Sequence, residues 1–301
     1  MELVIDTAAL LQANYSQLDI SFDSAQGVLW THLDQRDIPC VTLTLLQELQ
    51  HHHEAIETTG GVIWEQSQPV PVRYAVLASR TPGVFNLGGQ LSLFRELIRA
   101  KNRAALLHYG VECIKVQFSR LNRFNLPLTT IALVQGDALG GGFEGVLACD
   151  VIIAEKGCLM GFPEILFNLF PGMGAYNLLC RKVGIATTEK LLLSGTMYSS
   201  EELYALGVVD VLADPGYGVH QVHAYVKSME RRANGFRAVQ QVRQRCQSIG
   251  YEELLAVVEI WVDAALRLSE RDLKVMDRFV RSQEKTFLAP SQEQLPARRV
   301  G

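Results

Sequence analysis

The chain has 301 residues, of which 48% are hydrophobic and 20% are charged, with a formal net charge of −4. The absence of excess positive charge argues against nucleic-acid binding, and no apolar run reaches the roughly 18 residues that a membrane-spanning helix needs. The first six residues carry acids where a secretory signal would carry Lys or Arg. These features predict a cytoplasmic protein without membrane insertion.

In chain order, short apolar runs alternate with amphipathic runs, which predicts strands over 18–23, 28–32, 72–78, 129–135 and 151–154, and helices over 42–59 and 91–121. Buried strands alternating with helices indicate an α/β fold with right-handed crossovers. From residue 163 onward the pattern is mostly helical, and a turn-rich segment lies at 214–218. We therefore predict a core over residues 1–213 and a helical C-terminal region over residues 214–301.

Three consecutive histidines, His51, His52 and His53, lie within the first predicted helix. Successive residues on a helix point about 100° apart, so these side chains cannot converge on one metal ion. We interpret them as a solvated helix face. The six cysteines have no short ligand spacing and are expected to be reduced, mostly buried thiols. Neither a metal nor another cofactor is predicted.

Two glycine clusters stand between a predicted strand and a predicted helix. They are Gly88-Gly89 and the triplet Gly140, Gly141 and Gly142. Glycine lets a ligand approach the backbone closely, and a helix N-terminus adds unpaired N–H groups. Either cluster alone is more often a turn or packing device. Together they indicate an oxyanion hole, whereas the phosphate-loop alternative lacks its GxxxxGK[ST] pattern.

Two glutamates follow glycine-containing segments. Glu144 comes directly after the triplet, and Glu164 follows Pro163 within an otherwise apolar stretch. Each could be a helix-start acid that complements the helix dipole. A carboxylate in apolar surroundings must, however, be paired, hydrogen-bonded or functional. Two glutamates beside an oxyanion hole suit removal of a proton α to a carbonyl and proton delivery to a leaving hydroxyl.

Three segments resemble the signature of the crotonase (enoyl-CoA hydratase/isomerase) superfamily: residues 131–144 (IALVQGDALGGGFE), 161–164 (GFPE) and 170–174 (FPGMG). The resemblance implies a crotonase-like spiral core of ββα units. It also implies an oxyanion hole made by Gly141 with Gly89 or Gly88, and an acid/base pair made by Glu144 and Glu164.

A narrower resemblance links the chain to the diffusible-signal-factor synthases of Gram-negative bacteria. It rests on residues 84–91 (VFNLGGQL), 166–176 (LFNLFPGMGAY), 259–265 (EIWVDAA) and 276–281 (MDRFVR). Gln90 stands where that pattern carries an acid, and Asn168 where ordinary hydratases carry glycine. The resemblance implies dehydration of a 3-hydroxyacyl-carrier-protein thioester, followed by hydrolysis to a cis-2-unsaturated fatty-acid signal for quorum sensing. It suggests Met173, Trp261 and Phe279 as the lining of an acyl pocket, with ordinary core packing as the alternative.

The alternative enzyme is an enoyl-CoA hydratase of fatty-acid metabolism, which would leave the thioester intact. A binding protein on an inactive crotonase scaffold is disfavoured because both glutamates are present. The resemblance further implies an acyl-carrier-protein or acyl-CoA thioester as substrate and the receiver domain of a sensor kinase as a partner. It also implies a homotrimer or hexamer, in which the C-terminal helices cover the pocket and make subunit contacts.

Overall fold

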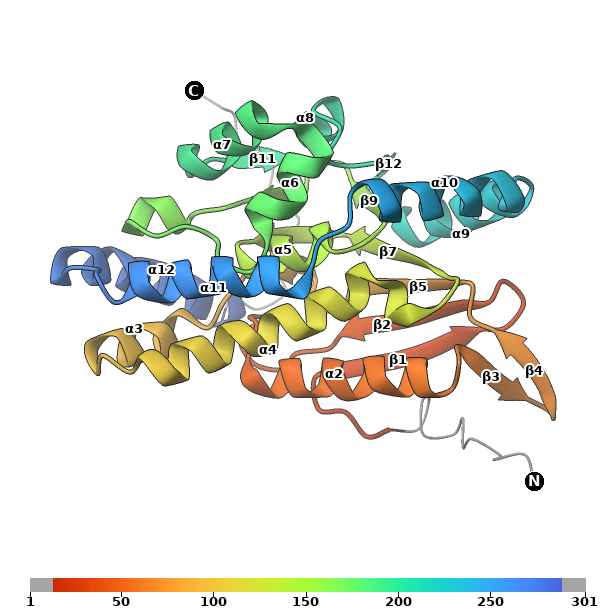
Figure 1. Cartoon of the computed structure of the whole chain (residues 1–301), viewed down its shortest axis with the longest axis horizontal. Coiled ribbons are helices and arrows are strands. Elements are labelled where there is room, and N and C mark those ends of the chain that lie inside the picture. The colour runs from red at the N-terminus through yellow and green to blue at the C-terminus, as the bar shows by residue number, and fades with distance from the viewer. Residues whose placement is uncertain (1–12, 289–301) are drawn as a thin grey trace.

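The computed structural model describes residues 13–288 (Figure 1). At its centre is a six-stranded sheet in the order β1-β2-β5-β7-β9-β12. Neighbouring strands are parallel except for the antiparallel pair β1 and β2. The strands are β1 (Leu18–Asp23), β2 (Val28–Leu33), β5 (Tyr74–Ser79), β7 (Thr129–Val134), β9 (Val151–Glu155) and β12 (Val211–Ala213). Every residue of the inner strands β2, β7 and β9 is buried, as a parallel sheet covered on both faces requires.

A second, four-stranded sheet has the order β11-β10-β8-β6. Its strands are β6 (Gly83–Asn86), β8 (Gly136–Leu139), β10 (Leu159–Gly161) and β11 (Met197–Ser199). β6, β8 and β10 run parallel, and each follows a strand of the large sheet directly, so the chain repeats a ββα unit. A separate hairpin pairs β3 (Val62–Glu65) with β4 (Gln68–Pro71). The sequence patterns did not predict the small sheet or this hairpin.

Helices cover both faces of the large sheet (Figure 1). In β7, Ala132 and Val134 join the cluster that contains α4, whereas Ile131 and Leu133 pack toward α9. The helices are α2 (Leu43–Thr58), α3 (Leu91–Arg99), α4 (Arg103–Leu121), α5 (Gly141–Leu147), α6 (Ala175–Val183), α7 (Ile185–Ser194), α8 (Ser200–Ala205), α9 (Gly218–Glu230), α10 (Ala233–Cys246), α11 (Tyr251–Ala265) and α12 (Glu270–Leu288), with 3₁₀ turns η1 (Arg123–Asn125) and η2 (Glu164–Phe167). α11 packs on α4, and α12 packs on α3.

The predicted single helix over 91–121 is two helices. Lys101 adopts a left-handed conformation (φ +51°) between α3 and α4. Asn102 then caps α4 by accepting a hydrogen bond from the Ala105 N–H at 3.1 Å. The cap satisfies a helix-terminal donor that a continuous helix would not expose.

The prediction of a solvated face for the histidine run is wrong for two of its three members. His52 and His53 are 0% and 2% exposed, while His51 is exposed. α2 turns this side toward the protein interior, where His52 Nε2 lies 2.9 Å from the Thr31 hydroxyl. Burial lowers the pKa of His52 to about 3, so the ring is neutral and costs less to bury.

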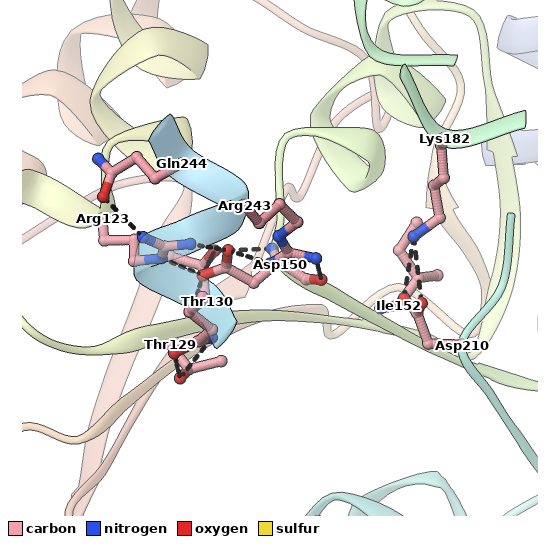
Figure 2. A network of polar contacts seen from close by, with 10 residues as sticks. Arg123, Thr129, Thr130, Asp150, Ile152, Lys182, Asp210, Arg243 and Gln244 are labelled. Carbon is pink, nitrogen blue, oxygen red and sulfur yellow. Dashed lines mark hydrogen bonds and ion pairs between the residues drawn. The ribbon is translucent and has the colours of Figure 1, made fainter. Parts of the chain in front are cut away.

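An ion-pair network around the buried Asp150 carboxylate joins α10 to the core (Figure 2). The Asp150 carboxylate accepts two hydrogen bonds from the Arg123 guanidinium, both at 2.7 Å, and one from Arg243 of α10 at 2.6 Å. It also accepts from the Thr130 backbone N–H at 3.0 Å. Two cations and a backbone donor thus compensate one buried carboxylate.

Between residues 13 and 288, no helix is both long and apolar enough to cross a membrane. The same part of the chain contains no group of three or more His, Cys, Asp or Glu side chains arranged to hold a metal ion. All six cysteines are free, and four of them are buried.

Candidate active site

A largely apolar cavity is lined by six of the eight residues that the sequence predicted to form the active site. They are Gly89, Gly141, Glu144, Glu164, Met173 and Trp261. The walls come from helices α2, α3, α4, α5 and α11, from the turn η2, from strands β2, β5 and β6, and from the loops before α3 and α6. Counted with the open space at its mouth, the cavity has a volume of about 960 Å³. Gly88 and Phe279 are not part of its lining.

The loop after β6 exposes one backbone N–H to the cavity. Gly88 has φ +88°, and a Cβ there would lie 2.7 Å from the Leu139 carbonyl oxygen, so the position requires glycine. Its N–H donates to Asn86 Oδ1 at 2.9 Å and is therefore committed. No acceptor for the Gly89 N–H occurs among the described residues. Of the two candidates, Gly89 is thus the one with a free donor.

The second donor comes from the start of α5. Gly141 is the first residue of this helix, so its N–H has no acceptor within the helix. The preceding Gly140 has φ +51°, which turns β8 sharply into α5. A Cβ built on Gly141 would lie 3.4 Å from the Gly89 nitrogen, so the two backbone segments are in contact. This arrangement can direct two N–H groups at one oxygen atom.

Glu144 occupies the first turn of α5 and is 1% exposed. Its Oε1 accepts hydrogen bonds from the backbone N–H groups of Met173 and Ala175, at 2.8 and 3.1 Å. Burial raises the pKa of Glu144 to about 7, although the two backbone donors act in the opposite direction.

Glu164 begins η2 and points into the same cavity. Its Oε1 lies against Gly140, where a Cβ would collide with it. Its Oε2 is buried and has no hydrogen-bond partner within residues 13–288. Burial, followed by the nearby charge of Glu144, raises the pKa of Glu164 to about 8. Two carboxyls that titrate near neutral pH in one apolar cavity are suited to acid/base chemistry.

Of the three residues predicted to form the acyl pocket, two line the cavity and one lies behind its lining. Met173 and Trp261 line the cavity and are 6% and 2% exposed. The Trp261 ring meets the Phe94 ring edge-on, with centroids 5.2 Å apart. Phe279 lies behind the wall, because it contacts Phe167, a lining residue, with ring centroids 5.4 Å apart.

Sequence reasoning missed two residues at this site. Gln283 of α12 donates through Nε2 to the carbonyl oxygens of Leu87 and Gly89, at 2.9 and 3.2 Å. Arg120 of α4 lines the cavity although it is only 3% exposed. Arg120 continues the inward-facing positions Tyr109 and Cys113 at helical spacing, and this signal could have identified it.

The model of the enoyl-CoA hydratase/isomerase family matches residues 64–221, just over half of the chain. The chain belongs to the enoyl-CoA hydratase/isomerase family. The match contains both glycine loops and both glutamates. It confirms the predicted superfamily.

Individual relatives agree with this family. The chain is 27% identical to a probable mitochondrial enoyl-CoA hydratase 2 of Arabidopsis thaliana, over 71% of this chain and 65% of the relative. It is 33% identical to the mitochondrial methylglutaconyl-CoA hydratase of Rattus norvegicus, over 46% and 42%. The chain thus spans less than two thirds of the length of these relatives.

A solved structure shares the fold. The human mitochondrial delta3-delta2-enoyl-CoA isomerase superposes with a TM-score of 0.72 at 17% identity, covering 90% of this chain and 99% of the isomerase. The expected crotonase-like α/β fold with a helical C-terminal region is therefore confirmed. The narrower resemblance to signal synthases remains a prediction.

Proposed function

We propose that this enzyme dehydrates a 3-hydroxyacyl-carrier-protein thioester and then hydrolyses the thioester, releasing a cis-2-unsaturated fatty acid that serves as a diffusible quorum-sensing signal. The observation that carries the proposal is the placement of two carboxyls and two free backbone N–H groups around one apolar cavity. The likeness of residues 84–91 and 259–265 to the signal synthases favours this activity within the family.

The dehydration needs one proton acceptor and one proton donor. One glutamate takes the proton from the α carbon, and the electron pair moves to the thioester oxygen, where the N–H groups of Gly89 and Gly141 stabilise the negative charge. The enolate then expels the 3-hydroxyl, which leaves as water with a proton from the other glutamate. The pKa values of about 7 for Glu144 and about 8 for Glu164 allow both protonation states near neutral pH.

Hydrolysis reuses the same groups. A glutamate accepts a proton from water as its oxygen attacks the thioester carbonyl, and the tetrahedral oxyanion occupies the site between the two N–H groups. Collapse breaks the C–S bond, and the thiol leaves with a proton from the cavity acid. One oxyanion hole therefore serves both steps, because each develops charge on the same oxygen.

The test is incubation of the purified protein with a 3-hydroxyacyl-carrier protein, followed by mass spectrometry of the products. Release of a free cis-2-enoic acid by the wild type, and not by Glu144→Gln or Glu164→Gln, is the expected result. A 2-enoyl thioester without free acid would assign the chain to the alternative, an enoyl-CoA hydratase. The names of the curated relatives, which are hydratases, favour that alternative.

The remaining partners are part of the same proposal. The carrier-protein or coenzyme A thioester is the substrate, the receiver domain of a sensor kinase is a regulatory partner, and the enzyme acts in the cytoplasm as a trimer or hexamer. In this assembly the region over 214–301 covers the pocket and makes subunit contacts. Light scattering of the purified protein measures its oligomeric state.

A further inference from the structure

Arg120 is a buried cation in the wall of the cavity. It lies in the last turn of α4 and is 3% exposed. A guanidinium remains charged at any physiological pH, and buried charges normally have a charged partner. Within residues 13–288, no carboxylate lies within 4.0 Å of the Arg120 guanidinium.

The contacts that Arg120 does make are weak. Nη1 lies 4.0 Å from the Cys149 sulfur, Nη2 lies 3.4 Å from His53 Nε2, and the guanidinium carbon is 5.5 Å from the centre of the Phe124 ring. Burial and the Arg120 charge keep the pKa of His53 well below its usual value, so His53 is neutral. The partial negative charge at the end of α4 also falls short of a full counter-charge.

Asp150 follows Cys149 in the sequence but is already engaged. Its Oδ1 accepts from Arg123 and Arg243, and its Oδ2 accepts from Arg123 and the Thr130 N–H (Figure 2). The fold thus gives two nearby arginines a shared carboxylate and leaves the cavity-facing Arg120 without one.

The cavity connects the oxyanion position to Arg120 along two helices. On α4, Tyr109 lies beside Gly89, and Arg120 follows after about 16 Å of helix rise. On α5 and its C-cap, Gly141, Gly145 and Ala148 line the cavity on the same side. A Cβ built at Gly145 meets no atom within 4 Å outside its chain neighbours and the backbone of its own helix. Small side chains therefore leave room between the two ends.

We propose that Arg120 binds the terminal carboxylate of an ω-carboxyacyl thioester whose carbonyl oxygen lies between the Gly89 and Gly141 N–H groups. The inference rests on the proposed thioester chemistry and specifies its substrate class. The apolar walls contact the methylene chain, and the guanidinium forms a bidentate ion pair with the carboxylate.

A methyl-terminated chain of the same length leaves the guanidinium unpaired and desolvated, and the site discriminates against it for that reason. Because an extended carbon chain advances about 1.2 Å per bond, a chain of about 14 carbons spans the rise of about 16 Å between the oxyanion position and Arg120.

The test compares 3-hydroxyacyl coenzyme A thioesters of matched length that end in a carboxylate or in a methyl group. For the wild type, kcat/KM for dehydration is expected to favour the carboxylate by about 30-fold or more. In Arg120→Met, which keeps the side-chain length without the charge, this ratio falls to about one or below. Arg120→Lys keeps the charge and part of the preference. A wild-type ratio of about one or less overturns the inference.

A binding measurement separates this inference from the proposed activity. A free dicarboxylic acid is expected to raise the melting temperature of the wild type more than the matched monocarboxylic acid, and Arg120→Met is expected to abolish the difference. If the dicarboxylic acid raises the melting temperature but neither thioester is turned over, the proposed function is contradicted and the carboxylate site at Arg120 is supported. Equal turnover of the two thioesters, or equal stabilisation by the two acids, would exclude Arg120 as a carboxylate-binding site and leave the proposed function unaffected.

Discussion

Glu144 and Glu164 line the same apolar cavity but differ in their hydrogen-bond donors. Glu144 Oε1 accepts two backbone N–H groups, whereas the buried Oε2 of Glu164 accepts none from the described chain. The backbone donors stabilise the ionised form of Glu144, and its charge then opposes ionisation of Glu164. Glu144 therefore loses its proton first, which makes Glu144 the candidate base and Glu164 the candidate acid.

The pH dependence of dehydration follows from this order. With a pKa of about 7 for Glu144 and about 8 for Glu164, the form with one ionised and one protonated carboxyl is most populated between these values. We expect a bell-shaped profile of kcat/KM with its maximum in that interval, and apparent pKa values that belong to the pair. The measurement is the initial rate across a pH series at constant ionic strength.

Glutamine at either position keeps the shape of the side chain but cannot exchange a proton. Glu144→Gln and Glu164→Gln are each expected to lower the rate about 100-fold or more. Residual activity of Glu144→Gln should lack the acidic limb of the profile, and that of Glu164→Gln the basic limb. Near-wild-type rates in either variant would remove that glutamate from the chemistry.

Folding stability should also depend on these carboxyls. Their pKa values lie above the 4.5 of an ordinary glutamate, so between about pH 5 and pH 8 the folded state binds more protons than the unfolded chain. The stability they provide is fully present below their unfolded pKa and is lost as pH rises through their folded values. Glu164→Gln cannot ionise, and its melting temperature relative to wild type is expected to rise from about pH 5 to about pH 9. Glu259→Gln removes an exposed carboxyl and serves as the control. If the difference in melting temperature between Glu164→Gln and wild type does not change with pH, burial does not oppose ionisation of Glu164.

The sequence predicted the parts of the fold that local pattern determines. The strands around residues 18–33 and 129–134, and helix α2, lie where the apolar and amphipathic runs predicted them. The sequence did not predict β8 and β10, because both strands are short. Their glycines make close backbone contacts, so the strands carry few side chains that could form an apolar pattern. The glycine and glutamate motifs predicted the oxyanion-hole and acid/base residues. The contacts of Arg120 and Gln283 depend on long-range packing, which the motifs do not encode.

Removal of one backbone donor tests the oxyanion hole. Gly141→Pro deletes the N–H at the first position of α5, where proline is tolerated, so the fold should persist. The rate is expected to fall about 10² to 10³-fold. Gly141→Ala keeps the N–H and should lose much less activity, since its Cβ makes only ordinary contacts. Equal rates for the proline variant and wild type, with matching circular dichroism, would exclude Gly141 as a donor.

Gln283 is expected to act as a positioning residue for the loop that carries Gly89. Gln283→Met removes its donor, so the loop loses its hydrogen bonds to α12. Because a shift of about 1 Å in an active-site group can cost about 100-fold, kcat should fall by about 10 to 100-fold with little change in KM. Gln283→Lys retains an N–H donor and should recover part of kcat. A purely structural role would lower the melting temperature of both variants without this recovery.

The last prediction concerns Trp261, which is both a core residue and a wall of the cavity. Trp261→Ala removes its contact with Phe94 and should cost about 3–5 kcal/mol of stability. It also enlarges the cavity, so longer or bulkier acyl chains should gain relative to short ones, by up to about 0.8 kcal/mol per added methylene that is buried. Val258→Ala is the control, because Val258 is fully buried on the same helix but outside the cavity lining. It should lower the melting temperature and leave the chain-length profile of the products unchanged. The same outcome for Trp261→Ala would assign Trp261 to the core and remove it from the acyl pocket.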